Sequence, residues 1–455
     1  MLSRRNFIKT AGAGVLAASI GGGNLFAEQS KKPNILMILI DDLGYSDVSC
    51  YGSESYHTPS VDKLAREGLS FSDAYAACPV CSPTRASILT GKHPARLHLT
   101  DWIPGHKHPH EKLQIPDWQK RLPDKEITIG EALKEIGYNT AWLGKWHQGG
   151  SAHPTEMGFD RGGENWSLNK KRTDKDPKGT VTLTRQCQDF IRDSKKQNKP
   201  FFACLSHYTV HTPVYGSSDT KEKYKKYFDR LEPRYQDRAD YAAMVADMDK
   251  SVADMLRFLK HEDLEDTIVI FFSDNGGLFG KTHNYPLRAG KGTLYEGGIR
   301  VPLIFKWPGV TKAGEETKEI ATSHDLYTTI LSMAGINKVD RTLDGVDLCP
   351  LLKEGRPIDR EAIYWHYPHY HKTKPASAIR KGDYKLIEYL EDGKKELYNL
   401  ERDISEKNDL AEKMPEKTKE LYEDLCRWRD EVGAQEMKPN PNYKPNKAKK
   451  KNVSL

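Results

Sequence analysis

The stretch Ile35-Leu36-Met37-Ile38-Leu39-Ile40 is a run of apolar residues that ends at Asp41-Asp42. A continuous apolar run of this length is typical of a strand that is buried on both faces of a sheet. Four later runs have the same character, at residues 140–143, 201–205, 267–272 and 301–305. The sequence therefore predicts a series of central strands, the first of which ends in two adjacent carboxylates.

Segments of helical length and periodicity lie between these strands. They cover residues 59–67, 128–136, 183–194, 238–261 and 324–334. Strands that alternate with helices predict an α/β fold with a large mixed, mostly parallel sheet, flanked by helices on both faces.

The pattern changes from about Cys349. Residues 376–390 and 395–400 are expected to form antiparallel strands with a turn at Glu391-Asp392-Gly393, and a helix is expected near residues 415–431. We therefore predict an α/β domain, a smaller C-terminal α+β subdomain and a disordered basic tail. Their expected bounds are 28–348, 349–436 and 437–455.

The composition is that of a folded protein, with 37% hydrophobic and 29% charged residues among 455. The formal net charge of +6 comes from the two ends of the chain, because residues 1–27 and 437–455 carry basic residues and no acidic ones. The body between them is slightly acidic. A solvated basic tail explains the pattern, and weak attraction to a polyanion or a membrane surface is the alternative. It does not indicate a nucleic-acid partner.

The first 27 residues resemble a twin-arginine export signal. Arg4-Arg5 precedes Phe7-Ile8-Lys9 and a glycine-rich apolar stretch that is too short to span a bilayer stably. A frayed N-terminus or an amphipathic helix is the alternative. No later segment reads as a membrane span, so we predict a periplasmic or otherwise exported protein without stable membrane insertion.

Carboxylates and an amide follow the first and fourth predicted strands, as Asp41-Asp42 and Asp274-Asn275. Ligand sites of open α/β sheets lie beyond the carboxyl ends of the strands. Two carboxylates ~4 Å apart repel by about 4 kcal/mol, so three ionised ones need a cation. Their hard oxygen donors favour Ca²⁺ or Mg²⁺. Each pair taken alone also suits a helix cap or a turn.

Seven cysteines are few for this length, and their odd number leaves at least one thiol without an internal disulfide partner. One of them opens the segment Cys81-Ser82-Pro83-Thr84-Arg85-Ala86-Ser87-Ile88-Leu89-Thr90-Gly91. With this C-x-P-[ST]-R-x-x-x-L-T-G signature the sequence resembles the type I, formylglycine-dependent sulfatases of the alkaline phosphatase superfamily. The alternatives are a buried thiol, or a turn with Arg85 as a surface charge.

Further blocks of that family follow in the same order. They are Gly137-Tyr138-Asn139-Thr140, Gly144-Lys145-Trp146-His147, His211-Thr212-Pro213, Ser273-Asp274-Asn275-Gly276-Gly277, Gly290-Lys291-Gly292, Gly297-Gly298-Ile299-Arg300-Val301-Pro302 and Glu396-Leu397-Tyr398-Asn399-Leu400. The resemblance begins at about Pro33 and runs slightly past the last block. Gln148 departs from the leucine that is common after Lys-Trp-His, which concerns the shape of the pocket rather than the mechanism.

The resemblance implies a set of metal ligands, namely Asp41, Asp42, Asp274, Asn275 and the formylglycine oxygen made from Cys81. Formylglycine is the aldehyde formed when this cysteine is oxidised, so a formylglycine-generating maturation enzyme is an implied partner. The expected metal is Ca²⁺, with Mg²⁺ as the alternative.

The resemblance also implies the catalytic groups. Arg85, Lys145 and Lys291 would supply cationic donors to the sulfate oxygens. One hydroxyl of the hydrated aldehyde would attack sulfur and form a covalent sulfate ester. His211 would protonate the departing alcohol, aided by Lys291, and His147 would take the proton of the second hydroxyl, so that sulfate is expelled.

Two histidine-rich stretches remain. His106-Lys107-His108-Pro109-His110 is a loop or a second metal site, and the segment from Trp365 to His371 offers aromatic faces with polar tips that suit a sugar. Packing between the subdomains is the other explanation of the second stretch. We predict that substrate is bound by Trp365, His366 and His369, together with Arg85, Lys145, His211 and Lys291.

The leading hypothesis is an exported sulfatase that hydrolyses sulfate esters on a sulfated carbohydrate, with a galactose or N-acetylgalactosamine sulfate as the expected sugar. A phosphonate or phosphate ester hydrolase of the same superfamily is the first alternative. An inactive sulfated-glycan-binding protein is the second, although the complete set of matching residues argues against it.

Overall fold

The computed structural model describes residues 32–149, 153–163, 173–229 and 238–448. An eight-stranded sheet forms its centre, in the order β10-β2-β9-β8-β1-β7-β5-β6. These strands are β1 (Ile35–Ile40), β2 (Leu69–Phe71), β5 (Asn139–Gly144), β6 (Arg161–Gly163), β7 (Phe201–Ser206), β8 (Ile268–Ser273), β9 (Leu303–Lys306) and β10 (Glu315–Thr317). Only β9 is antiparallel to its neighbours. The sheet is therefore mixed and mostly parallel, which confirms the predicted fold class.

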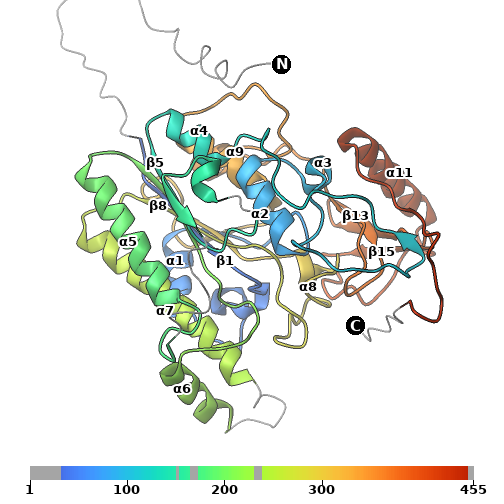
Figure 1. The fold of residues 1–455 in the computed structure, drawn as a ribbon, viewed down its shortest axis with the longest axis horizontal. Helices are drawn as coiled ribbons and strands as arrows, with labels where there is room; N and C mark the ends of the chain where they lie inside the picture. The colour runs from blue at the N-terminus through green and yellow to red at the C-terminus, as the bar shows by residue number, and fades with distance from the viewer. Residues whose placement is uncertain (1–31, 150–152, 164–172, 230–237, 449–455) are drawn as a thin grey trace, which may run out of the picture.

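Strand β1 lies in the middle of the sheet because both of its faces are apolar, and all of its residues are fully buried. Ile35, Met37 and Leu39 share a core with α2, α4 and α9, whereas Leu36 and Ile38 share the opposite core with α1, α5 and α7. Figure 1 shows these two groups of helices on opposite sides of the sheet. The helices are α1 (Pro59–Glu67), α2 (Cys81–Thr90), α4 (Ile129–Glu135), α5 (Thr180–Lys196), α7 (Ala239–His261) and α9 (Asp325–Met333).

The C-terminal subdomain is a four-stranded antiparallel sheet with one long helix, at the right of Figure 1. Its elements are β12 (Ala362–Tyr367), β13 (Ala376–Lys381), β14 (Tyr384–Tyr389), β15 (Lys395–Asn399) and α11 (Pro415–Val432). Successive residues of β13 face opposite ways, so Ile379 packs with Leu425 of α11 while Ala378 packs with Tyr295 of the large domain. The expected α+β subdomain is present, and one face of its sheet packs on the large domain.

Short elements complete the fold. They are the helices α3 (Pro94–Leu97), α6 (Ser218–Phe228), α8 (Glu296–Ile299) and α10 (Cys349–Glu354), the strands β3 (Ala74–Tyr75), β4 (Leu113–Gln114), β11 (Ala321–Thr322) and β16 (Lys438–Pro439), and 3-10 turns at Tyr45–Asp47, Ser49–Tyr51 and Pro154–Met157. Among the described residues, no helix is both long enough and apolar enough to cross a membrane.

The structure differs from the sequence-based expectation at four places. Residues 376–390, expected as one strand, form the two paired strands β13 and β14. The sequence pattern does not predict the helix α2, nor the edge strand that residues 362–367 form. The tail is not disordered after Met437, because β16 pairs with β4 and the chain is described up to residue 448. Residues 1–31 and 449–455 lie outside the described residues, so the export signal stays a prediction.

Candidate active site

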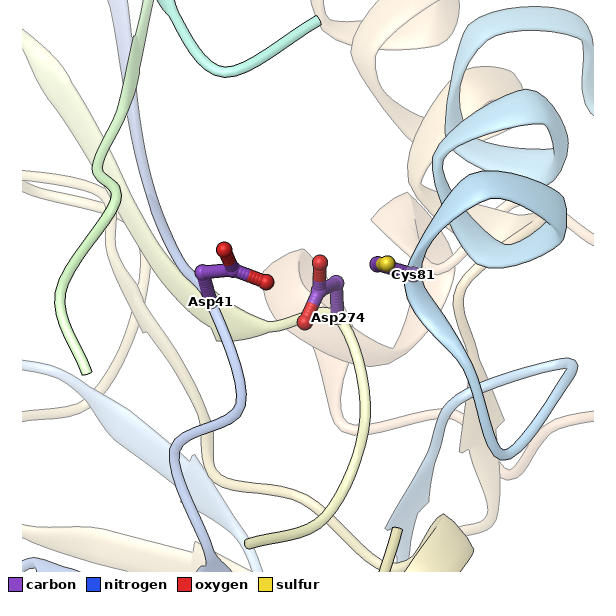
Figure 2. A group of neighbouring side chains, drawn as sticks. All are labelled: Asp41, Cys81 and Asp274. Atoms are coloured by element: carbon purple, nitrogen blue, oxygen red, sulfur yellow. The ribbon is translucent and has the colours of Figure 1, made fainter. Parts of the chain in front are cut away.

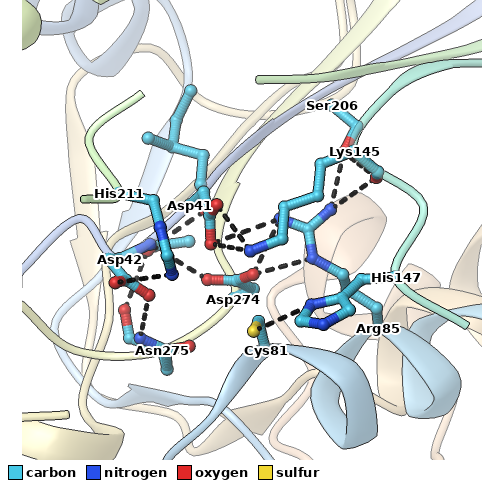
Figure 3. A network of polar contacts seen from close by, with 12 residues as sticks. Asp41, Asp42, Cys81, Arg85, Lys145, His147, Ser206, His211, Asp274 and Asn275 are labelled. Carbon is cyan, nitrogen blue, oxygen red and sulfur yellow. Dashed lines mark hydrogen bonds and ion pairs between the residues drawn. The ribbon is translucent and has the colours of Figure 1, made fainter. Parts of the chain in front are cut away.

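Four ligand-type side chains meet at the carboxyl ends of two neighbouring strands. β1 and β8 pair in parallel, so that Asp41-Asp42 and Asp274-Asn275 leave the sheet side by side (Figure 3). The backbone N–H of Asp274 donates to the carbonyl of Ile40 at 3.1 Å, and that of Asp42 donates to Asp274 Oδ1 at 3.1 Å. All four side chains are buried. The predicted ligands are thus brought together by the sheet.

The acidic group also includes the signature cysteine. Ligand atoms of Asp41, Cys81 and Asp274 all lie within 4.8 Å of one another (Figure 2). Burial raises the pKa of Asp274 above its usual range, and the adjacent Arg85 guanidinium offsets only part of this increase. A carboxyl group in this state is stabilised by an added positive charge. The cluster therefore fits a bound cation.

The amide of Asn275 gives independent support for a cation. Its Nδ2 donates to Asp42 Oδ1 and to the carbonyl of Gly276, both at 2.9 Å. Both partners can only accept, so the amide orientation is determined and Oδ1 is left buried without a hydrogen-bond partner among the described residues. A buried oxygen in this state is costly unless it has a ligand. Carboxylate and amide oxygens together suit Ca²⁺ or Mg²⁺.

Cys81 is the first residue of α2, which is buried along its whole length between the sheet and α9. Its Sγ lies 3.1 Å from Nδ1 of His147. The Nε2 atom of the same ring lies 2.6 Å from the carbonyl oxygen of Ile103, which can only accept, so Nε2 carries the proton of the neutral ring. Burial and the nearby Lys145 ammonium lower the pKa of His147 to about 4. His147 is therefore neutral near pH 7, with its basic nitrogen toward residue 81.

Arg85 lies one helical turn below Cys81 and has a different position from the one predicted. Its Nε donates to Asp274 Oδ2 at 2.8 Å, and its Nη1 donates to the carbonyl of Lys145 at 2.8 Å and to Ser206 Oγ at 2.6 Å (Figure 3). The side chain is fully buried and does not line the cavity described below. The guanidinium therefore holds Asp274 and the end of β5 in place, rather than reaching a sulfate oxygen.

Two lysines pair with the two carboxylates of β1. Lys145 Nζ lies 2.6 Å from Asp41 Oδ2, and Lys291 Nζ lies 2.6 Å from Asp42 Oδ1. Burial would lower the pKa of each ammonium, but the adjacent carboxylates raise both pKa values above the usual range. Both lysines also line the cavity, so two permanently charged ammonium groups face a ligand bound there.

His211 lies on the loop after β7, beside Asp42 (Figure 3). Its Nδ1 donates to the carbonyl of Thr212 at 2.5 Å, and its Nε2 lies 3.8 Å from Asp42 Oδ2. Burial lowers the pKa of His211, while Asp41 and Asp42 act in the opposite direction. Lys178 Nζ donates to the carbonyls of His211 at 2.7 Å and Pro213 at 3.0 Å, and so fixes this loop.

These groups open into a cavity of about 550 Å³. The predicted residues that line it are Asp41, Asp42, Cys81, Lys145, His147, His211 and Lys291. The volume is within the range of small-molecule sites, of about 300–1,000 Å³. The cavity therefore has room for a saccharide unit beside the reacting group.

The three aromatic or histidine residues that we predicted to bind substrate lie elsewhere. Trp365 Nε1 donates to the carbonyl of Ala76 at 2.8 Å, His366 bonds to Ser377, and His369 Nε2 lies 2.8 Å from Thr100 Oγ1. All three are buried, and none lines the cavity. This corrects the prediction in favour of the alternative, packing between the subdomains.

Several residues that line the cavity are not predicted by the sequence. They are Trp102, His106, Lys178, Tyr208, Thr212, Pro213, Leu278, His371 and Lys372. His106 and His371 belong to the two histidine-rich stretches. These stretches did indicate a function, but the residues predicted from them to bind substrate are not the ones that line the cavity. Among the described residues, His106–His110 is not part of any group with metal-ligand geometry, so it gives no support for a second metal site.

Comparison with known proteins agrees with this geometry. A family model described as Sulfatase matches residues 33–336. A second one, described as N-sulphoglucosamine sulphohydrolase, C-terminal, matches residues 289–431. The chain is 32% identical to a sulfatase from Formosa agariphila, over 85% of this chain and 86% of that protein.

Two further relatives extend the comparison. An N-acetylgalactosamine-6-sulfatase from Rattus norvegicus is 32% identical over 80% of this chain and 72% of its own length. The crystal structure of Ps i-CgsB in complex with k-i-k-neocarrahexaose superposes with a TM-score of 0.76 and 30% identity, over 91% of this chain and 95% of that one. The family matches cover both domains and every residue of the site. The chain belongs to the sulfatase family, whose members are sulfuric ester hydrolases.

Proposed function

We propose that this sulfatase hydrolyses sulfate esters on a sulfated carbohydrate, with residue 81 oxidised to formylglycine and Ca²⁺ held by the carboxylates of β1 and β8. One observation carries the proposal. The ligand atoms of Asp41, Cys81 and Asp274 lie within 4.8 Å of one another, and Asp41 and Cys81 line a cavity together with Lys145 and Lys291. Relatives named for N-acetylgalactosamine-6-sulfate or crystallised with a neocarrahexaose support a saccharide substrate.

The bound groups and the chain have separate tasks. When present, formylglycine supplies a hydroxyl nucleophile, and the cation withdraws electron density from the sulfuryl group. Asp41, Asp42, Asp274 and Asn275 would hold the cation. Lys145 and Lys291 bind the sulfate oxygens, because their ammonium groups face the cavity beside residue 81.

The two histidines handle protons on different sides of the site. His211 donates through Nδ1 to a backbone carbonyl, so its Nε2 holds a proton only in the imidazolium form. Asp41 and Asp42 favour that form, and the imidazolium would give its Nε2 proton to the departing alcohol. His147 is fixed by Ile103 with its basic Nδ1 toward residue 81. It therefore takes a proton from the oxygen at residue 81 when sulfate is released.

The direct test is turnover by the matured protein. The chain is expressed with a formylglycine-generating enzyme, and release of inorganic sulfate is measured from defined sulfated saccharides, in parallel with matched phosphate esters. We expect sulfate release that disappears in Cys81→Ala. Faster turnover of the phosphate esters would identify a phosphoester hydrolase instead, and tight binding without turnover by fully modified protein would identify a glycan-binding protein.

We also propose that the chain is exported by the twin-arginine route after oxidation of Cys81 in the cytoplasm. Arg4-Arg5 and the following apolar stretch support the export route. The burial of Cys81, which is 1% exposed, supports its oxidation before the chain folds and is exported. Periplasmic and cytoplasmic fractions would be compared for the wild type and for a double variant with lysine at both arginine positions. Equal distribution of the two proteins would refute this route.

A further inference from the structure

Three rings from two distant parts of the sequence form one wall of the cavity, which we call the ring wall: Trp102, His106 and His371. The rings of His106 and His371 have centroids 4.7 Å apart, and those of Trp102 and His106 lie 5.0 Å apart in an edge-to-face arrangement. Trp102 Nε1 donates to His106 Nδ1 at 3.2 Å. All three residues line the cavity. The two histidine-rich stretches of the sequence thus meet at the catalytic cavity.

The ring wall is fixed relative to the reacting groups. Ile103, next to Trp102, donates through its backbone N–H to Ser82 Oγ at 3.0 Å and accepts the hydrogen bond from His147 at 2.6 Å. The same segment is therefore anchored to the residue after Cys81 and to the histidine that faces it. A saccharide that packs on this wall has a defined distance from residue 81.

The other end of the ring wall adjoins the sulfate-binding lysine. The ring of His371 lies directly over Gly292, the residue after Lys291, where a Cβ atom would come within 1.7 Å of His371 Nδ1. Gly292 also has a φ of +82°, which disfavours any other residue. The glycine thus permits the close approach of the wall to Lys291.

Lys372 adds a charge at the edge of the ring wall. It is exposed, lines the cavity, and forms no ion pair with a carboxylate among the described residues. The cavity carboxylates Asp41 and Asp42 are already paired with Lys145 and Lys291. An exposed cation that lines the cavity and has no carboxylate partner is available to an anionic group of the substrate.

We propose that the ring wall and Lys372 form a subsite for a saccharide with a second anionic group, the sugar packing on the rings and the anion on the Lys372 ammonium. Aromatic rings offer apolar faces on which the C–H faces of sugars can pack. The preferred substrate is then a doubly anionic saccharide. This inference rests on the proposed function and specifies its substrate class.

The test compares three saccharides with the same backbone, carrying one sulfate, two sulfates, or one sulfate and one uronate carboxylate. Lys372→Gln should lower kcat/KM by about tenfold for a doubly anionic saccharide, and by less than twofold for the singly sulfated one. The loss should shrink at high salt, because the side chain is exposed. Lys372→Arg should restore the preference.

Lys374→Gln is the matched control. Lys374 lies two residues along the same segment, pairs with Asp392 at 2.7 Å, and does not line the cavity. We expect this variant to behave as the wild type on all three saccharides. A loss with only the disulfated compound would identify the second anion as sulfate, whereas a loss with both doubly anionic compounds would extend it to carboxylate. No loss, or an equal loss on all three, would overturn the proposal.

Binding separates this proposal from the catalytic one. The same three saccharides are titrated calorimetrically into Cys81→Ala protein, with and without Lys372→Gln. A Kd for a doubly anionic saccharide that rises about tenfold in the double variant supports the subsite even if no saccharide is hydrolysed. Equal Kd values for all three saccharides in Cys81→Ala protein would contradict the subsite, whatever the activity.

Trp102→Ala tests the ring wall itself. It should weaken binding of all three saccharides by a similar factor, because each loses the same packing surface, while inhibition by inorganic sulfate stays unchanged. Unaltered saccharide binding in this variant would exclude the wall as a sugar platform.

Discussion

The Nδ1 atom of His147 lies 3.1 Å from the Sγ atom of Cys81, and its position is set from the far side of the ring by the carbonyl of Ile103. The imidazole is therefore neutral and oriented before any substrate arrives. A base that is neutral and already in contact with its target needs no rearrangement when the proton is transferred.

Residue 81 is the first point at which the assignment can be tested. Protein made with a maturation enzyme should show a residue 81 of lower mass than cysteine, by peptide mass spectrometry, and Cys81→Ala should abolish turnover. Cys50→Ala is the control, because Cys50 is an exposed cysteine outside the cavity. Full activity of protein that retains the Cys81 thiol would end the formylglycine assignment.

The two histidines should differ in their dependence on the leaving group. His211→Ala should reduce turnover of a sugar sulfate by about 10²–10⁴-fold, and that of an activated aryl sulfate much less, since an aryl oxide departs without protonation. His147→Ala should slow both substrates alike and allow sulfated enzyme to accumulate, as seen by intact mass. Equal losses in His211→Ala, or accumulation there instead, would mean that the roles are exchanged.

Removal of the metal should lower both activity and stability. Ca²⁺ at about 100 times its Kd should stabilise the wild type by about 2.7 kcal/mol, and a chelator should remove this gain together with turnover. Asp274→Ala should bind no metal and should lose the response in thermal unfolding. Asp249→Asn, at a buried acid that accepts from the N–H groups of Ser60 and Val61, keeps the response. Metal content unchanged in Asp274→Ala would refute the ligand set.

A buried histidine should make the fold sensitive to acid. Burial lowers the pKa of His207 to about 3, whereas an unfolded histidine has a pKa of about 6.5. The stability contributed by the neutral ring is therefore complete above pH 6.5 and is lost as pH falls toward the folded value. Between pH 7 and pH 5 this single group should cost about 2 kcal/mol of unfolding free energy.

The measurement is urea unfolding at several pH values in the presence of a chelator. His207→Gln should reduce the loss of unfolding free energy between pH 7 and pH 5 by about 2 kcal/mol, because the glutamine amide does not take up a proton. His261→Gln, at a histidine whose side chain is 86% exposed, should leave the slope as it is. A decline that is equally steep in both variants would show that other groups cause it.

A buried ammonium joins the two domains. Lys385 Nζ of β14 lies 2.8 Å from Glu296 Oε1 of α8 and 2.8 Å from Glu406 Oε1, and all three residues are fully buried. Lys385→Met would leave the buried Glu406 carboxylate without a cation and Glu296 with Arg300 alone, and should lower the unfolding free energy by about 3–5 kcal/mol. Lys413→Met, at an exposed lysine, should have no effect on it. Equal unfolding midpoints for these variants would contradict a role for the ammonium at this interface.

The fold could be predicted where local pattern and burial agree. The bounds of β1 and α1 match the expectation because a continuous apolar run and an amphipathic period are local signals. The helix α2 could not be found in this way, since all of its residues are buried and its sequence has no apolar stripe. Residues 362–367 mix aromatic and polar side chains, which hides the strand period.

The residues of the site likewise differ in whether a local sequence pattern predicts them. The carboxylates could be assigned because strand ends and ligand chemistry coincide at Asp41 and Asp274. The contact between His106 and His371 joins residues far apart in the chain, and no local pattern encodes it. The family resemblance predicts Arg85 at the sulfate, but a sequence does not show that a buried carboxylate, here Asp274, already pairs with this side chain.

Because α2 is buried, maturation would depend on how fast Cys81 is oxidised relative to how fast the chain folds. Cys81 is 1% exposed at the start of a helix that is packed between the sheet and α9, so an oxidising enzyme of protein size has no access to it once the chain has folded. Under the proposed formylglycine assignment, each molecule would either be modified before α2 is covered or stay inactive for the rest of its lifetime. The active fraction of a preparation would record the ratio of the oxidation rate to the folding rate, and slower folding at lower temperature would raise it even when the amount of maturation enzyme is constant.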